Sequence, residues 1–127
     1  MSGAGATAGT NWKNGIDLAV ADINAKGGIL GKQIEIVHYD TQTNPGNTRA
    51  AVQRAIDEGT YAVLGPVFSG PIGASMQIAQ RAEIAQLVGG EAAGLTKQGN
   101  QFLFRTSLSQ AAAMPKIANY LKNTVKA

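Results

Sequence analysis

The chain has 127 residues, of which 44% are apolar and 15% charged, and its formal net charge is +3. This length suits one domain with one core over residues 1–127, and no apolar run is long enough to cross a bilayer. The basic residues are scattered without interleaved aromatic residues, which argues against a nucleic-acid surface. The lack of cysteine excludes disulfides, thiol catalysis and thiolate metal sites. Small and polar residues follow Met1, so we expect no signal peptide in this chain.

The first third of the chain predicts a loop, a helix and a strand. Residues 2–10 are glycine, alanine and hydroxyl residues without apolar periodicity, which is typical of a loop. Apolar residues at helical spacing then predict a helix over residues 11–25, ended by Gly27 in a left-handed cap. Residues 33–40 alternate apolar and polar side chains and predict a strand that ends at Asp40.

A second helix and the central strand follow. We expect Asn47 to cap the helix and Gly59 to end it, because one apolar stripe runs between them. A short apolar run over residues 61–67 predicts a strand, and residues 70–81 again show helical periodicity. Pro71 suits the first turn of that helix, since its missing N–H would have no partner within the helix. The side chains predicted to face inward are Ile72, Met76 and Ala79.

The last third predicts two further strands and a helix. Residues 86–88 and 101–106 are short strand candidates, and the turn-rich residues 94–100 have room for one helical turn. The final helix is expected to start near Pro115, because proline is best tolerated at a helix start.

This alternation of helices and strands predicts an α/β fold. Short connections imply right-handed crossovers and a parallel sheet with helices on both faces. Ligands of such sheets bind beyond the carboxyl ends of the strands. Four loops are therefore expected to converge at one edge, over residues 40–44, 67–70, 89–92 and 106–109.

Ser69 lies between the predicted strand over residues 61–67 and the predicted helix over residues 70–81. Its hydroxyl, with the unpaired N–H groups of the helix's first turn, is suited to hold a carboxylate or another small anion. The alternative is that Ser69 only caps the helix.

Several runs of the sequence resemble the N-terminal lobe of type I periplasmic solute-binding proteins of the leucine/isoleucine/valine-binding kind. The runs are GIDLAVADINAKGGILG over residues 15–31, Tyr39-Asp40, Asn44-Pro45, and GPVFS over residues 65–69. The similarity continues through residues 104–106 and 120–121, so it covers nearly the whole chain. It implies a flavodoxin-like three-layer lobe of a two-lobe protein. Such proteins bind a small ligand between the lobes in the periplasm and deliver it to the permease of an ABC transporter.

The resemblance also implies which residues bind the ligand. The serine that matches Ser69 binds the ligand's carboxylate, helped by the loop that matches residues 90–92. The first loop supplies further contacts, and Phe68 is placed to line the cleft. The expected ligand-binding residues are Thr7, Ala8, Phe68, Ser69, Gly70, Gly90, Glu91 and Ala92.

One departure from the family pattern leaves the ligand open. Amino-acid-binding members carry a threonine or serine where this chain has Gly90-Glu91-Ala92-Ala93, which weakens the case for a leucine-like ligand. Glu91 is suited to meet an ammonium group or the other lobe, or else it is a solvated loop acid. Amino acids, aromatic acids and small amides all stay open as ligands.

A second departure concerns the extent of the chain. The family's first strand would precede Ser2 and lie between the strands at residues 33–40 and 61–67, and the second lobe would follow Ala127. We expect both to be absent from this chain. The missing strand would leave unpaired backbone groups in the sheet, so we expect rearranged or exchanged strands in a homodimer, or a piece of a larger protein.

The sequence also bears on classes of protein other than solute-binding proteins. An enzyme is disfavoured because the sole histidine, His38, lies in a predicted strand and Ser69 lacks a nucleophile elbow. No catalytic residue, metal or cofactor is therefore expected. The glycines of residues 3–9 lack the preceding strand that a dinucleotide site needs. A ligand-sensing receptor or regulator of the same fold, and a folding fragment without binding activity, remain alternatives.

Overall fold

The computed structural model describes residues 1–126 and contains an open sheet of three parallel strands. The strands are β1 (Ala62–Leu64), β2 (Ala85–Val88) and β3 (Leu103–Arg105), and they lie side by side in that order. Ala62 lies opposite Ala85, and Gln86 lies opposite Leu103. The expected α/β fold with a parallel sheet is confirmed, and so are the three strands predicted in this part of the chain.

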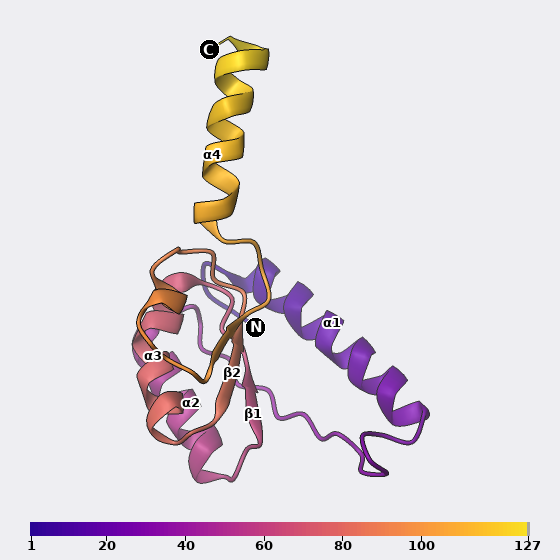
Figure 1. Cartoon of the computed structure of the whole chain (residues 1–127). Coiled ribbons are helices and arrows are strands. Elements are labelled where there is room, and N and C mark those ends of the chain that lie inside the picture. The colour runs from indigo at the N-terminus through magenta and orange to yellow at the C-terminus, as the bar shows by residue number, and fades with distance from the viewer. Residues whose placement is uncertain (127) are drawn as a thin grey trace.

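Helices precede, separate and follow these strands. They are α1 (Ala6–Ala25), α2 (Pro45–Asp57), α3 (Ser69–Arg81), the 3₁₀ turn η1 (Leu95–Lys97), α4 (Gln110–Tyr120) and the π-type turn η2 (Leu121–Val125). Helices α2 and α3 cover one side of the sheet, α1 lies on the other side, and α4 extends away from it (Figure 1). No described helix combines the length and apolar character that a membrane span needs.

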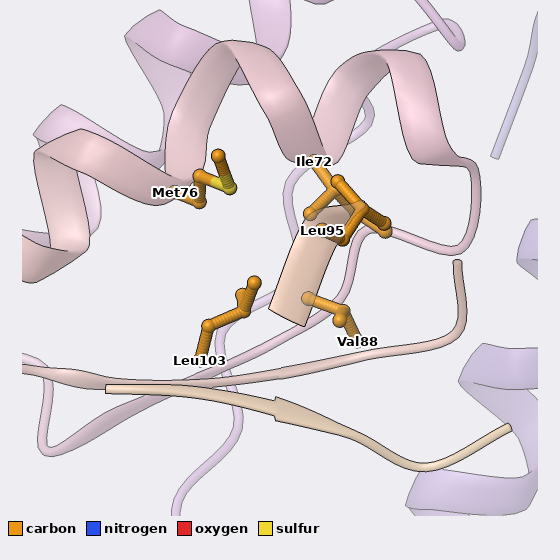
Figure 2. Packing of buried hydrophobic residues seen from close by; sticks show 5 residues of the cluster. All are labelled: Ile72, Met76, Val88, Leu95 and Leu103. Atoms are coloured by element: carbon orange, nitrogen blue, oxygen red, sulfur yellow. The ribbon is translucent and has the colours of Figure 1, made fainter. Parts of the chain in front are cut away.

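The main core lies between α3 and the sheet. Figure 2 shows Ile72 and Met76 of α3 facing Val88 and Leu103 of the sheet, with Leu95 of η1 beside them. All five side chains are buried, and burial of each contributes about 1.5–3 kcal/mol. The inward positions predicted for α3 are confirmed, since Ala79 is also buried and packs on Val52 of α2.

A buried amide joins β1 to the core. Gln86 on β2 is 1% exposed, and its Nε2 donates to the Gly65 carbonyl at 3.0 Å and to Ser75 Oγ at 3.1 Å. Because a buried polar group without partners would cost stability, these two bonds keep the end of β1 next to α3. The loop that leads from β1 to α3 therefore starts from a fixed point.

The prediction of a strand over residues 33–40 is wrong. This segment follows α1 as an extended trace without a ladder (Figure 1). Side chains of α1 hold it instead: Asn24 Nδ2 donates to the Ile34 carbonyl and Asn24 Oδ1 accepts from the Ile34 N–H, both at 2.8 Å. Farther along, His38 Nε2 lies 2.7 Å from Asp17 Oδ1. Alternating apolar and polar side chains are typical of a strand, but a strand also needs a neighbouring backbone to pair with.

The loop predicted over residues 2–10 is correct only as far as Gly5, because α1 begins at Ala6. The small residues at the start of α1 form no apolar stripe, so apolar periodicity does not detect the first turn of this helix. Alanine is nevertheless the best helix former, which agrees with a helix here. The Gly5 N–H donates to Thr43 Oγ1 at 2.9 Å, which fixes the start of α1 next to the loop before α2. The predicted end of the helix is confirmed, since α1 ends at Ala25 and Gly27 has a φ of 100°.

Two helix starts differ from the prediction. Asn44, not Asn47, caps α2, because Asn44 Oδ1 accepts from the Asn47 N–H at 3.0 Å and Pro45 occupies the first helical position. Helix α4 begins at Gln110, five residues before Pro115, which lies inside it. A serine cap starts this helix, since Ser109 Oγ accepts from the Ala111 N–H at 3.2 Å.

Candidate ligand-binding cleft

Ser69 is the first residue of α3, at the carboxyl end of β1. The cap position belongs to Phe68, which is extended (φ −97°, ψ 144°) and makes no side-chain cap bond. Ser69 therefore does not cap the helix, and its Oγ accepts a bond from the Ala92 N–H at 3.2 Å. Its hydroxyl proton is left available to donate to a ligand.

The backbone at the start of α3 offers further donors. The first turn closes with the bond from the Ile72 N–H to the Phe68 carbonyl at 3.1 Å. The N–H groups of Ser69 and Gly70 have no partner within the described part of the chain, and Pro71 has no N–H to satisfy. Because the positive end of the helix dipole lies here as well, this turn favours an anionic group.

The loop after β2 forms the facing wall and is held from two sides. The Ala92 N–H bonds Ser69, and the Ala92 carbonyl accepts from Arg105 Nη2 of β3 at 2.6 Å. The Glu91 carbonyl accepts from the Gln110 N–H at 3.0 Å, which ties the loop to the start of α4. Bonds to α3 on one side and to β3 and α4 on the other thus hold residues 91 and 92 in place.

Gly90 permits the close approach of these walls. A Cβ at this position would overlap Ile72 Cδ1 and would lie 3.0 Å from Leu95 Cδ1 and 3.1 Å from Ser69 Oγ. Gly90 is buried, so no side chain can be added here without displacing the core or the serine hydroxyl.

A cleft of about 320 Å³ opens between these elements. Its lining residues are Val67, Phe68, Ser69, Gly89, Gly90, Glu91 and Gln110. This volume lies at the small end of the range for ligand sites and suits an amino acid or a small acid better than a nucleotide. Glu91 and Phe68 are exposed, so one side of the cleft faces solvent.

The structure brings together most of the residues predicted to bind ligand. Phe68, Ser69, Gly90 and Glu91 line the cleft, and Ala92 bonds Ser69 directly. Gly70 does not line the cleft, although its N–H has no partner among the described residues. Thr7 and Ala8, as part of α1, do not line the cleft.

Sequence reasoning missed Gln110. This residue lines the cleft because Ser109 caps α4 immediately after the loop that follows β3. A signal was present, since a serine followed by good helix formers marks a helix start at the expected strand-end edge. The described residues contain no group of three histidine, aspartate or glutamate side chains that could hold a metal ion.

A parallel α/β sheet with a helix start suited to an anion at its carboxyl edge is typical of lobes that bind small molecules. A family model described as periplasmic binding protein matches residues 1–127. The chain belongs to this periplasmic binding protein family. Periplasmic binding proteins are named for binding and not for catalysis, which agrees with the expectation of a non-enzyme.

Individual relatives agree with this assignment. The Leu/Ile/Val-binding protein of Escherichia coli (strain K12) is 33% identical over 127 residues, which cover 99% of this chain and 35% of the relative. A crystal structure of the branched-chain amino acid transporter substrate binding protein LivJ from Streptococcus pneumoniae, in complex with isoleucine, superposes with a TM-score of 0.93. It is 32% identical and covers 98% of this chain and 36% of LivJ.

A third similar structure carries a different ligand. It is a solute binding protein of an ABC transporter from Rhodopseudomonas palustris in complex with 3,4-dihydroxybenzoic acid, with 25% identity and a TM-score of 0.87. The match covers 98% of this chain and 34% of that protein. The chain thus spans about a third of the length of the relatives it matches.

Proposed function

We propose that residues 1–127 form a single ligand-binding lobe of an extracytoplasmic solute-binding protein. The lobe captures a small ligand that carries a carboxylate, such as an amino acid or an aromatic acid, in the cleft at Ser69. The complete protein closes over the ligand and delivers it to the permease of an ABC transporter.

The observation that carries this proposal is the arrangement of donors at the start of α3. The Ser69 hydroxyl accepts from the Ala92 N–H, and a hydroxyl that already accepts one bond donates more strongly to an anion. The N–H groups of Ser69 and Gly70, which have no partner among the described residues, belong to the same first turn of α3. A hydroxyl and two N–H groups are the kind of donors that carboxylate oxygens accept from.

The ligands of the two similar structures support the same chemical group. One contains isoleucine and the other 3,4-dihydroxybenzoic acid. These molecules share a carboxylate and differ in everything else, and isoleucine alone has an ammonium group. Glu91 is the residue of the cleft suited to an ammonium group, so its role separates amino acids from aromatic acids.

An amide-resolved NMR titration tests the site in this chain. The ligands are leucine, isoleucine and 3,4-dihydroxybenzoate, and isoleucinamide serves as the matched compound without a carboxylate. We expect shifts at the amides of Ser69, Gly70, Glu91 and Ala92 with the acids and not with the amide. The amides of Thr7 and Ala8 are read in the same spectra, because the predicted contacts of these residues remain a prediction.

Substitution of Ser69 by alanine removes one bond to a charged group. Such a bond contributes about 1.5–3 kcal/mol, so the dissociation constant is expected to rise roughly ten- to a hundredfold. Thr96→Ala is the control, because it removes an exposed hydroxyl of η1 and is expected to leave the affinity unchanged. Equal affinity for isoleucine and isoleucinamide, or an unaltered Ser69→Ala variant, would contradict the proposal.

A further inference from the structure

The Ser69 hydroxyl is the last member of a row of hydrogen bonds that begins at α4. The Gln110 N–H donates to the Glu91 carbonyl at 3.0 Å. That carbonyl belongs to the same peptide unit as the Ala92 N–H, which donates to Ser69 Oγ at 3.2 Å. Both bonds have the same direction, so the row runs from the start of α4 through one peptide unit to the cleft.

The cap of α4 sets the first donor of this row. Gln110 is the first residue of the helix, and the next three N–H groups all bond Ser109. The Gln110 N–H is left to bond another part of the chain, the Glu91 carbonyl. Because the N–H groups of a first turn carry the positive end of the helix dipole, the Glu91 carbonyl meets a donor that polarises it.

Arg105 holds the other side of Ala92. Its Nη2 donates to the Ala92 carbonyl at 2.6 Å. Among residues 1–126, Arg105 forms no ion pair with a carboxylate, and its Nε is buried without a partner. A bond from a charged donor is roughly twice as strong as one between neutral groups. The guanidinium therefore fixes Ala92, while the bond from α4 acts on the peptide unit before it.

We propose that the first N–H of α4 and the Arg105 guanidinium are positioning groups for the Ser69 hydroxyl. Hydrogen bonds in a row strengthen one another, so the bond from α4 makes the Ala92 N–H a better donor to Ser69 Oγ. An Oγ that accepts this bond keeps its proton for an acceptor in the cleft. This role rests on the proposed function, because it is a role in the capture of a carboxylate.

Gln110→Pro tests the donor from α4, and Gln110→Ala is its matched variant. Both lack the amide side chain, but only proline also lacks the N–H. Proline suits the first helical position, as Pro45 does in α2, and the extended backbone of Ser109 suits the residue before a proline. The ligand is whichever of isoleucine and 3,4-dihydroxybenzoate the unaltered chain binds more tightly. We expect Gln110→Pro to bind it about three- to tenfold more weakly than Gln110→Ala does.

A double-mutant cycle separates this role from a structural one. If the row of bonds acts through the Ser69 hydroxyl, the difference between the two Gln110 variants should vanish when Ser69→Ala is added to both. A difference that persists without the hydroxyl would show that Gln110→Pro acts through the structure of the loop, and it would overturn the proposal.

Arg105→Gln tests the second positioning group, and Arg81→Gln removes the same charge elsewhere. Arg81 is exposed in the last turn of α3, roughly 18 Å from Ser69 at the rise of an α-helix. We expect Arg105→Gln to raise the dissociation constant about tenfold and Arg81→Gln to change it by less than about twofold. Because Arg105 bonds the carbonyl through one nitrogen, Arg105→Lys should restore the affinity to within about threefold of the unaltered chain. Equal effects of Arg105→Gln and Arg81→Gln, or no rescue by lysine, would contradict the role of Arg105.

Hydrogen exchange in the ligand-free chain separates a failure of this proposal from a failure of the proposed function. The Ala92 amide should exchange faster in Gln110→Pro than in Gln110→Ala, whereas the Ile72 amide, which closes the first turn of α3, should not differ. If the unaltered chain binds neither acid, the proposed function fails, and exchange at Ala92 alone decides whether the row of bonds positions Ser69. If the chain binds an acid but the two Gln110 variants agree in affinity and in exchange at Ala92, the positioning role is overturned and the proposed function stands.

Discussion

A methyl group at Gly90 tests whether the core and the cleft share the same space. Gly90→Ala places a Cβ that would overlap Ile72 Cδ1 and would lie 3.0 Å from Leu95 Cδ1 and 3.1 Å from Ser69 Oγ. The first two atoms are ends of side chains and can move, but they belong to the buried core of α3, β2 and η1. Overpacking of this kind costs about 1–3 kcal/mol.

The matched control is Gly94→Ala in the same loop. A Cβ at Gly94 meets nothing within 4 Å, and the backbone there (φ −72°, ψ −18°) is ordinary for alanine. This change should be neutral or stabilise the chain by about 0.4–1 kcal/mol, because alanine has fewer unfolded conformations than glycine. Urea unfolding followed by circular dichroism gives the free energies of unfolding of both variants. The dependence of this free energy on urea concentration should be the same for both.

A double-mutant cycle identifies the atom responsible. Ile72→Val removes the Cδ1 that the new methyl group would overlap. Alone, this change should cost about 0.5–1.5 kcal/mol, but beside Gly90→Ala it should cost less or restore stability. The expected coupling is about 0.5–3 kcal/mol. If Gly90→Ala is as stable as Gly94→Ala, or if the two changes add without coupling, the packing argument is wrong.

Two further predictions concern local contacts. The pKa of Asp17 is lowered first by the bond from Lys13 and then by that from His38. A carboxyl whose folded pKa is lowered stabilises the chain above its ordinary pKa of 3.8 and loses that contribution as the pH falls further. Asp17→Asn should therefore show a flatter loss of stability in acid titration below about pH 4, and an unchanged slope would contradict this reasoning. Asn44→Ala removes the cap of α2 and should lower the free energy of unfolding in urea by about 0.5–2 kcal/mol. Asn47→Ala should change it by less than about 0.5 kcal/mol. Equal effects of the two variants would show that Asn44 is not the cap.

The parts of the candidate site that follow from the order of helices and strands along the chain could be predicted from the sequence. The carboxyl ends of parallel strands share one edge, so Ser69 and residues 90–92 were expected to meet before any contact was known. The bond between Ser69 Oγ and the Ala92 N–H is the contact that this expectation implies. Gln110 escaped prediction because its place depends on where α4 starts, and Pro115 was a misleading marker of that start.

Local sequence determined the elements whose signals lie within a few residues of one another. The apolar stripe of α3, the end of α1 at Ala25 and the turn η1 all follow from spacing and from glycine, which act without reference to the rest of the chain. Only the tertiary structure decided the state of residues 33–40. A ladder requires a neighbouring backbone at the right distance, and a groove of about 780 Å³ separates this segment from β1. Its alternating side chains therefore line the groove without forming a strand.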